Sequence, residues 1–273
     1  MKKLLIRIIG IALCVVGLSA NAGLNGPSFS RDYIVDVALG TIPNASLVTM
    51  FGYSFNTGSV TNVNVWETQD AWTFLTTAST MELLSSSAND AAAGTGCRLV
   101  LTEGLDTNFA KISETVIPNG TSTVALVNTY KMINNSTCIS AGSGFVNAGN
   151  ITTRVTGAGS QQGYIATGAG TSRHGRITVP AGYTFVIKNI FILANKSGNQ
   201  ATTAVITPVL RLSDGTILHG LPDTVPNGSN PTITIPTGVV IGEKTTISFQ
   251  ITSVSTTGID ISVGASGVLI KNP

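Results

Sequence analysis

The feature that most constrains the fold is the division of the chain into short segments rich in Val, Ile, Thr, Phe and Tyr, separated by Gly, Asn, Ser and Pro. Such segments are typical of half-buried strands, and only residues 78–85 have a weak pattern at the 3.6-residue spacing of a helix. Many short strands with few helices predict an all-β fold, an antiparallel β-sandwich or jelly roll. The expected strands are residues 32–38, 47–54, 61–66, 97–103, 109–117, 122–127, 130–134, 150–155, 175–180, 183–194, 202–212, 231–236, 245–253 and 259–271.

A four-residue pattern, an apolar residue followed by Pro-x-Gly, punctuates these segments. Proline at the second position and glycine at the fourth suit a type I turn, so each occurrence predicts a turn. The four occurrences are Ile117–Gly120, Val179–Gly182, Val225–Gly228 and Ile235–Gly238.

The chain of 273 residues has room for two β regions, and a composition shift suggests where they meet. Residues 156–173 are rich in Gly, Ala and Ser and have little core material, which is typical of a linker or a long connection. We therefore expect an N-terminal β region over residues 23–160 and a C-terminal β-sandwich region over residues 161–273.

Residues 1–22 have the layout of a secretory signal peptide. Lys2, Lys3 and Arg7 precede an apolar run, and Ala20-Asn21-Ala22 offers the small residues of a cleavage site. The alternatives are a retained membrane anchor or a buried N-terminal segment, although the run is short for a full membrane span.

Charge excludes one class of partner. Only 10% of the residues are charged, and the net charge of +2 depends on the three basic residues of the first 22. Without them, 12 basic residues remain against 13 acidic ones, so no basic patch indicates nucleic acid. A surface of Thr, Ser, Asn and Gly instead suits a repetitive β protein that neighbouring subunits cover, and we expect a homo-oligomer.

Known catalytic patterns are absent from the sequence. His174 and His219 stand apart from each other and from any metal-ligand spacing, and no nucleophile elbow, phosphate-binding loop or dinucleotide fingerprint occurs. Paired carboxylates could perform glycoside hydrolysis, but turn or strand-surface positions are the commoner role of such acids. The acids that cluster in the sequence are Glu67, Asp70, Glu103, Asp106 and Glu114. We expect no enzyme activity, no cofactor and no metal.

Two pairs of residues remain as candidates for interaction or stabilisation. Trp66 and Trp72 lie six positions apart, where they could stack on a surface glycan, although packing in a core or interface is the commoner role. Cys97 and Cys138 could form one disulfide in an oxidising compartment, or be two small buried residues that never meet.

The block from Ala92 to Asn150 carries AGTGCRLVLTEGLDTNFAKISETVIPNGTSTV, then NTYKMIN and SAGSGFVNAGNI. This block resembles a segment of virion structural proteins of tailed bacteriophages, and the C-terminal GRITVPAGYTFVIKNIFILANKSG and ISVGASGVLIKN are similar to them as well. The resemblance extends diffusely over residues 50–273 and supplies no catalytic residue.

What the resemblance implies is a non-enzymatic β-rich component of a phage particle, a head-decoration or fibre-like protein that contacts capsid or other virion proteins. Such proteins assemble in the cytoplasm, so a cleaved signal peptide does not fit, and the N-terminus would have to remain unprocessed. The alternative is an exported β-sandwich protein of the periplasm or cell surface, for adhesion or carbohydrate binding, which residues 1–22 and the two cysteines favour.

Overall fold

The computed structural model describes residues 33–58, 62–196, 202–229 and 231–273. They form an all-β fold in which every strand pairing is antiparallel, as the sequence predicts. The expected signal peptide, residues 1–22, lies outside the described residues.

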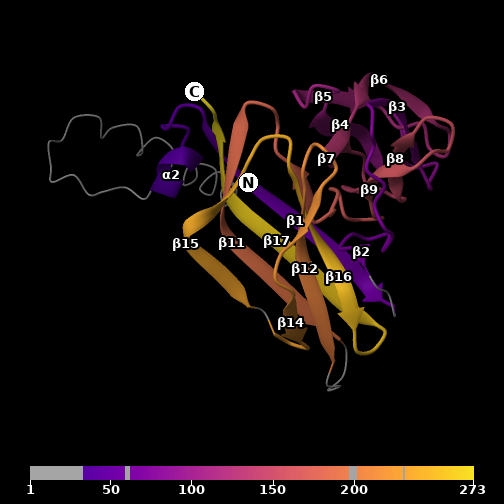
Figure 1. Ribbon diagram of the computed structural model, residues 1–273. Helices are drawn as coiled ribbons and strands as arrows, with labels where there is room; N and C mark the ends of the chain where they lie inside the picture. The colour runs from indigo at the N-terminus through magenta and orange to yellow at the C-terminus, as the bar shows by residue number, and fades with distance from the viewer. Residues whose placement is uncertain (1–32, 59–61, 197–201, 230) are drawn as a thin grey trace, which may run out of the picture.

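One pair of sheets forms a sandwich (Figure 1). Its first sheet has the order β1 (Ala45–Thr57), β17 (Ile259–Lys271), β11 (Tyr183–Asn195) and β15 (Thr232–Ile241). Its second sheet runs through β10 (Arg176–Thr178), β16 (Thr246–Val254), β12 (Thr203–Arg211) and β13 (Ile217–His219). In this sheet β14 (Asp223–Pro226) pairs with β12 and β2 (Val63–Asn64) pairs with β16. Alternate apolar residues of both sheets, among them Phe185, Phe249 and Ile261, pack into one core because successive side chains of a strand point to opposite faces.

A second unit, residues 79–165, stands beside the sandwich in Figure 1. One of its sheets has the order β6 (Val124–Tyr130), β3 (Ser79–Ser85), β8 (Ile151–Val155) and β9 (Gln161–Ile165). The other has the order β5 (Lys111–Val116), β4 (Cys97–Leu105) and β7 (Met132–Ala141). Met81 and Leu83 of the first sheet and Val100 and Ile133 of the second share a separate core.

The sheets do not follow the division expected at residue 160. Strand β1 pairs with β17 over most of its length, and β2 pairs with β16, so two strands from the N-terminal region belong to the sandwich of C-terminal strands. The stretch 156–173, expected to be a linker, contains β9, which completes a sheet with β8. Sequence reasoning missed this strand because Gln161–Ile165 has few apolar residues.

One stretch with a weak helical spacing is a strand, and one expected strand is a helix. The weakly helical stretch at 78–85 is strand β3, which lies between β6 and β8 with Met81 and Leu83 fully buried. Burial on both sides of the strand outweighs the short helical pattern. Conversely, residues 32–38, expected to be a strand, contain the helix α2 (Tyr33–Ala38). Gly40, two residues after its end, has a positive φ of 70°.

Three of the four Pro-x-Gly segments stand at the ends of strands, and all four glycines have positive φ: Gly120, Gly182, Gly228 and Gly238. The fourth segment does not end a strand. Residues 235–238 lie within β15, at a register shift opposite Ile187 and Asn189 of β11. The extra residues form an irregularity within this edge strand, and the expected turn does not form there.

Candidate functional site

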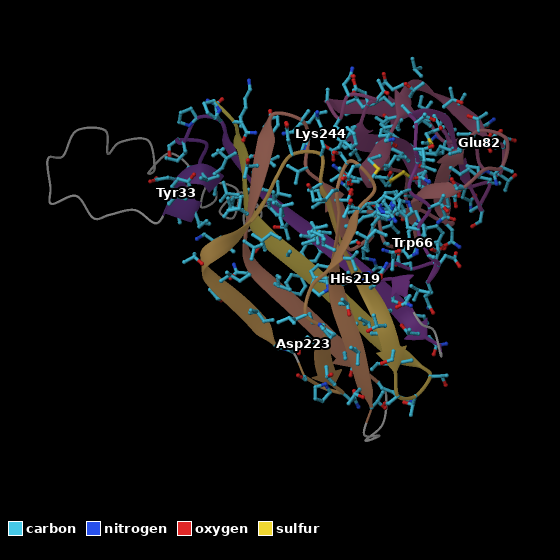
Figure 2. The ribbon with its side chains drawn as sticks, viewed as in Figure 1. Tyr33, Trp66, Glu82, His219, Asp223 and Lys244 are labelled. Atoms are coloured by element: carbon cyan, nitrogen blue, oxygen red, sulfur yellow. A yellow bond between two sulfur atoms is a disulfide. The ribbon has the colours of Figure 1, made fainter. Side chains whose placement is uncertain are left out.

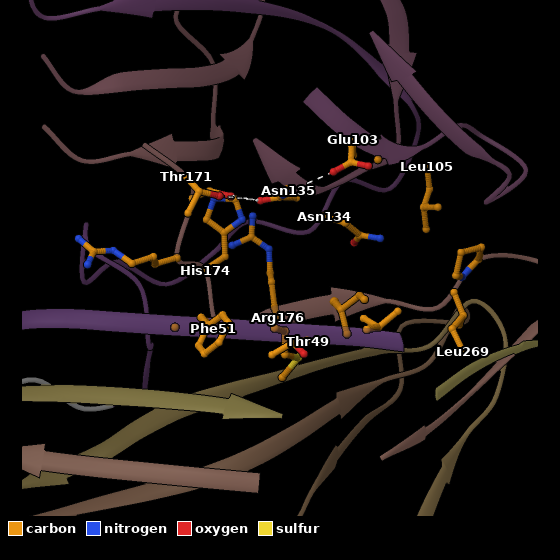
Figure 3. A pocket seen from close by; sticks show the side chains of 18 of the residues that line it. Thr49, Phe51, Glu103, Leu105, Asn134, Asn135, Thr171, His174, Arg176 and Leu269 are labelled. Atoms are coloured by element: carbon orange, nitrogen blue, oxygen red, sulfur yellow. Dashed lines mark hydrogen bonds between the residues drawn. The ribbon is translucent and has the colours of Figure 1, made fainter. Parts of the chain in front are cut away.

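A cleft of about 990 Å³ lies between the sandwich and the 79–165 unit. Figure 3 shows it between strand β1 below and the strands of the smaller unit above. One wall is residues 47–53 of β1, and the opposite wall comes from β4, β5 and β7. Residues 171–177, which lead into β10, close one end.

Asn134 of β7 ties the 79–165 unit to the sandwich. Its amide donates to the carbonyl oxygen of Thr178 at 3.0 Å and its Oδ1 accepts from the Thr178 amide at 2.9 Å. One side chain thus reproduces both hydrogen bonds of a strand neighbour and fixes β7 beside β10. The two units are therefore joined at this point by polar contacts that are specific in direction.

Arg176 lies at the boundary between the two units, stacked against two indole rings. Its guanidinium carbon is 3.5 Å from the ring centre of Trp72 and 5.2 Å from that of Trp66, and Nη2 donates to the carbonyl oxygen of Gln162 at 2.5 Å. Both indoles and Arg176 are buried. Cation–π attraction compensates part of the cost of burying a charge.

His174 is buried beside Arg176 and touches Trp66 edge-on. Its Nε2 accepts a hydrogen bond from the amide of Tyr164 in β9 at 3.1 Å, so the neutral ring carries its proton on Nδ1. Burial, and secondly the positive charge of Arg176, lower the pKa of His174 well below its ordinary value. The histidine is therefore a neutral acceptor that joins β9 to the sandwich.

An ion pair lies at the same end of the cleft. Arg173 pairs with Glu67, and its guanidinium carbon lies 4.6 Å from the ring centre of Tyr53. Burial raises the pKa of Glu67, and Arg173 partly offsets that effect. Glu67 also accepts from the amide of Ala166, so its carboxylate connects the loop after β2 to the end of β9.

The structure places the two tryptophans expected as an interaction pair in this interior. Trp66 has 2% and Trp72 6% of its surface exposed, so neither offers a free face to a glycan. Figure 2 shows Trp66 between the sandwich and the 79–165 unit. Trp72 packs on Phe74 with ring centres 4.4 Å apart, and Leu105 and Met132 complete the cluster. Their observed contacts are those of packing.

The clustered acids bind amide groups of the chain. Asp106 accepts from the amides of Asn108 and Ala110 within its own hairpin, at 2.8 and 2.9 Å. Glu114 of β5 accepts from two successive amides of β6, at 2.8 and 3.1 Å. Glu103 faces the cleft, where it accepts from the side-chain amide of Asn135 at 3.2 Å. These positions are turn and strand-surface positions.

Sequence reasoning missed the most heavily bonded acid, Asp90. This fully buried carboxylate accepts from the Ser85 hydroxyl at 2.5 Å and from the amides of Cys97, Ala148 and Gly149 at 2.6, 2.8 and 2.9 Å. It thereby joins the beginning and end of the segment that resembles phage proteins. The glycine-rich sequences around it were the available signal, because Gly96 and Gly149 have no room for a side chain there.

Cys97 and Cys138 form a disulfide between the neighbouring strands β4 and β7. His219 lies exposed in β13, away from the residues that line the cleft. Within the described ranges no group of three or more His, Cys, Asp or Glu side chains is arranged to hold a metal ion. No helix in the part of the chain that the structure describes has the length and apolarity to span a membrane.

Comparisons with known proteins give limited information. No family model matches the chain, and no curated protein matches it either. Among solved structures, the T13 particle of infectious bursal disease virus matches with 11% identity over 87% of this chain and 74% of the other, at a TM-score of 0.24. The VP2 subviral particle of the same virus matches with 11% identity over 85% and 73%, at a TM-score of 0.23. Scores this low carry no argument about fold or function.

Proposed function

We propose that this chain is a non-enzymatic structural protein of a tailed-bacteriophage particle, a head-decoration or fibre-like component that assembles with its own copies or with other virion proteins. The observation that carries the proposal is the segment Ala92–Asn150, whose glycine and turn pattern resembles such proteins. In the structure, backbone amides near both ends of this segment donate hydrogen bonds to the carboxylate of Asp90.

The surface supports an assembling protein. The chain has few charges, and several large apolar side chains have more than half of their surface exposed. They are Phe51, Phe55, Val127 and Val240 on strands, and Phe145 and Leu221 in loops. Exposed apolar groups of this kind are common at interfaces between subunits, whereas a charged surface keeps proteins apart.

A fractionation of infected cells tests the proposal. Particles are purified on a density gradient, and the protein is followed by quantitative mass spectrometry beside the major shell protein. A constant ratio of the two proteins across the particle peak supports the proposal. A protein that remains at the top of the gradient, free of particles, contradicts it.

Besides the signal-like residues 1–22, the exported alternative is favoured by the disulfide between Cys97 and Cys138. Disulfides persist in the periplasm and outside the cell and are rare in the cytoplasm. A glycan-binding function loses its main candidate, because Trp66 and Trp72 are buried. Recovery of the protein in the periplasmic fraction, with a mature N-terminus at Gly23, would favour this alternative.

A further inference from the structure

Strand β1 has an unfilled edge inside the cleft. It stands at the end of its sheet and pairs with β17 on one side. On the other side, Gly175 donates to the Phe51 carbonyl at 2.7 Å and Tyr53 donates to the Arg173 carbonyl at 3.3 Å. This second pairing ends there, because the chain then continues as β10 and pairs with β16 of the opposite sheet.

The remaining edge groups can be assigned from the register. Residues 45–54 pair with β17 without a shift, so Leu47 and Thr49 direct their backbone groups to the same side as Phe51 and Tyr53. Among the described residues, nothing pairs with the amide and carbonyl groups of Leu47 and Thr49 or with the Phe51 amide. A row of unpaired groups of this kind is a template for one more strand.

The cleft has the dimensions and lining for a single extended segment. Leu47 to Phe51 spans about 13 Å at 3.3 Å per residue, and the volume of about 990 Å³ lies beside this row. Val48, Leu105, Ile112 and Ile177 contribute apolar surface to the lining. Strands β4 and β5 contribute residues 103–105 and 111–113 to the opposite wall.

The sequence contains a segment of matching chemistry. Residues 4–19, LLIRIIGIALCVVGLS, are apolar except for Arg7 and the small Ser19, and six of the 16 are Ile or Val. This composition favours strands, and it is costly to leave in water. The 13 residues that connect it to Tyr33 extend to about 47 Å at most. The helix α2, which starts at Tyr33, contacts β1.

We propose that residues 4–19 of the unprocessed chain add as a strand to the open edge of β1 and fill the cleft, either in their own copy or in a neighbouring one. The inference rests on the proposed function, because assembly in the cytoplasm leaves the N-terminus in place. It also gives the apolar segment a role in a particle protein, where a signal peptide has none.

Hydrogen exchange at single-residue resolution tests the proposal on the full-length protein. We expect exchange at the amides of Leu47, Thr49 and Phe51 to be at least tenfold slower, as in paired strands, than in a variant that lacks residues 2–22. The amides of Val48 and Met50 pair with β17 and are the internal control, since their protection shows that the truncated variant is folded. Equal exchange at the three edge amides in both proteins would overturn the proposal.

A second variant retains the complete chain. Ile8→Asp with Ile11→Asp places a charge on each face of the proposed strand, because positions 8 and 11 have opposite parity. We expect this variant to exchange at the three edge amides like the truncated protein. Slow exchange that persists in the double variant would show that another group covers the edge.

Cys14 lies within the proposed strand and, since the structure pairs the other two cysteines, serves as a native crosslinking site. In the variant Thr49→Cys, we expect oxidation to join Cys14 to the cysteine introduced at position 49, within one copy or between two. The yield should exceed at least tenfold that of the Cys14 crosslink in the exposed control Val127→Cys. Equal yields would contradict the proposal.

The inference and the proposed function can fail separately. Particles that contain a chain beginning at Gly23 would overturn this inference while leaving the proposed function intact. An unprocessed chain whose edge amides are protected, but which never joins particles, would support this inference and contradict the proposed function.

Discussion

The carboxylate of Asp90 provides the sharpest test of how the 79–165 unit is held together. Its oxygens accept four hydrogen bonds at 2.5–2.9 Å, three of them from backbone amides. Replacement by alanine leaves Cys97, Ala148 and Gly149 with amide groups that lose their acceptor. A buried donor without a partner costs about 1–3 kcal/mol, and such costs within one network are not additive.

We therefore expect Asp90→Ala to lower the free energy of unfolding by about 3–6 kcal/mol, measured by urea denaturation under equilibrium conditions. Asp106→Asn is the matched control, because it keeps an oxygen for the amides of Asn108 and Ala110 in an exposed turn. This control should change stability by less than about 0.5 kcal/mol. A loss below about 1 kcal/mol for Asp90→Ala would refute the view that this carboxylate joins the ends of the segment.

Three further predictions concern His174, the disulfide and the close backbone contact at Gly52. Because the pKa of His174 is lowered, the unfolded chain binds a proton in mild acid that the folded chain does not. The free energy of unfolding should therefore fall below about pH 6.5, by up to about 1.4 kcal/mol per pH unit. His174→Gln should flatten this dependence, measured by urea titrations at about pH 5 and 7. A dependence unchanged in that variant would contradict the buried neutral ring. Replacing Cys97 and Cys138 together by serine should cost about 4 kcal/mol for a 41-residue separation, and an unchanged urea midpoint would count against the disulfide. Gly52→Ala should cost about 1–3 kcal/mol, because its Cβ would lie 2.5 Å from the Gly175 Cα, and thermal unfolding at an unchanged temperature would contradict this close contact.

Local patterns predicted the β class but could not predict which strands are neighbours. The Pro-x-Gly segments marked strand ends at Gly120, Gly182 and Gly228, since proline and positive φ act locally. The pairing of β1 with β17 joins residues more than 200 positions apart, and nothing in either segment encodes it alone. The expected division at residue 160 missed this pairing for that reason.

The candidate site was equally hard to read from the sequence. The cleft lies beside the part of β1 that the chain leaves after Gly175, where it continues as β10 and pairs with β16 of the other sheet. Trp66 and Trp72 suggested an exposed platform or a packed pair, and only their stacking with Arg176 decides for the interior. Asp90 stood in an ordinary run of Ser, Ala and Asn, and its importance depends on amides up to 59 positions away.

The most direct test of the proposed function is the intact mass of this protein in purified phage particles. We predict a chain that retains residues 2–22, present at a fixed ratio to the major shell protein across the particle peak. A chain that begins at Gly23 and occurs only in the periplasm or on the cell surface would contradict the virion assignment and favour the exported alternative.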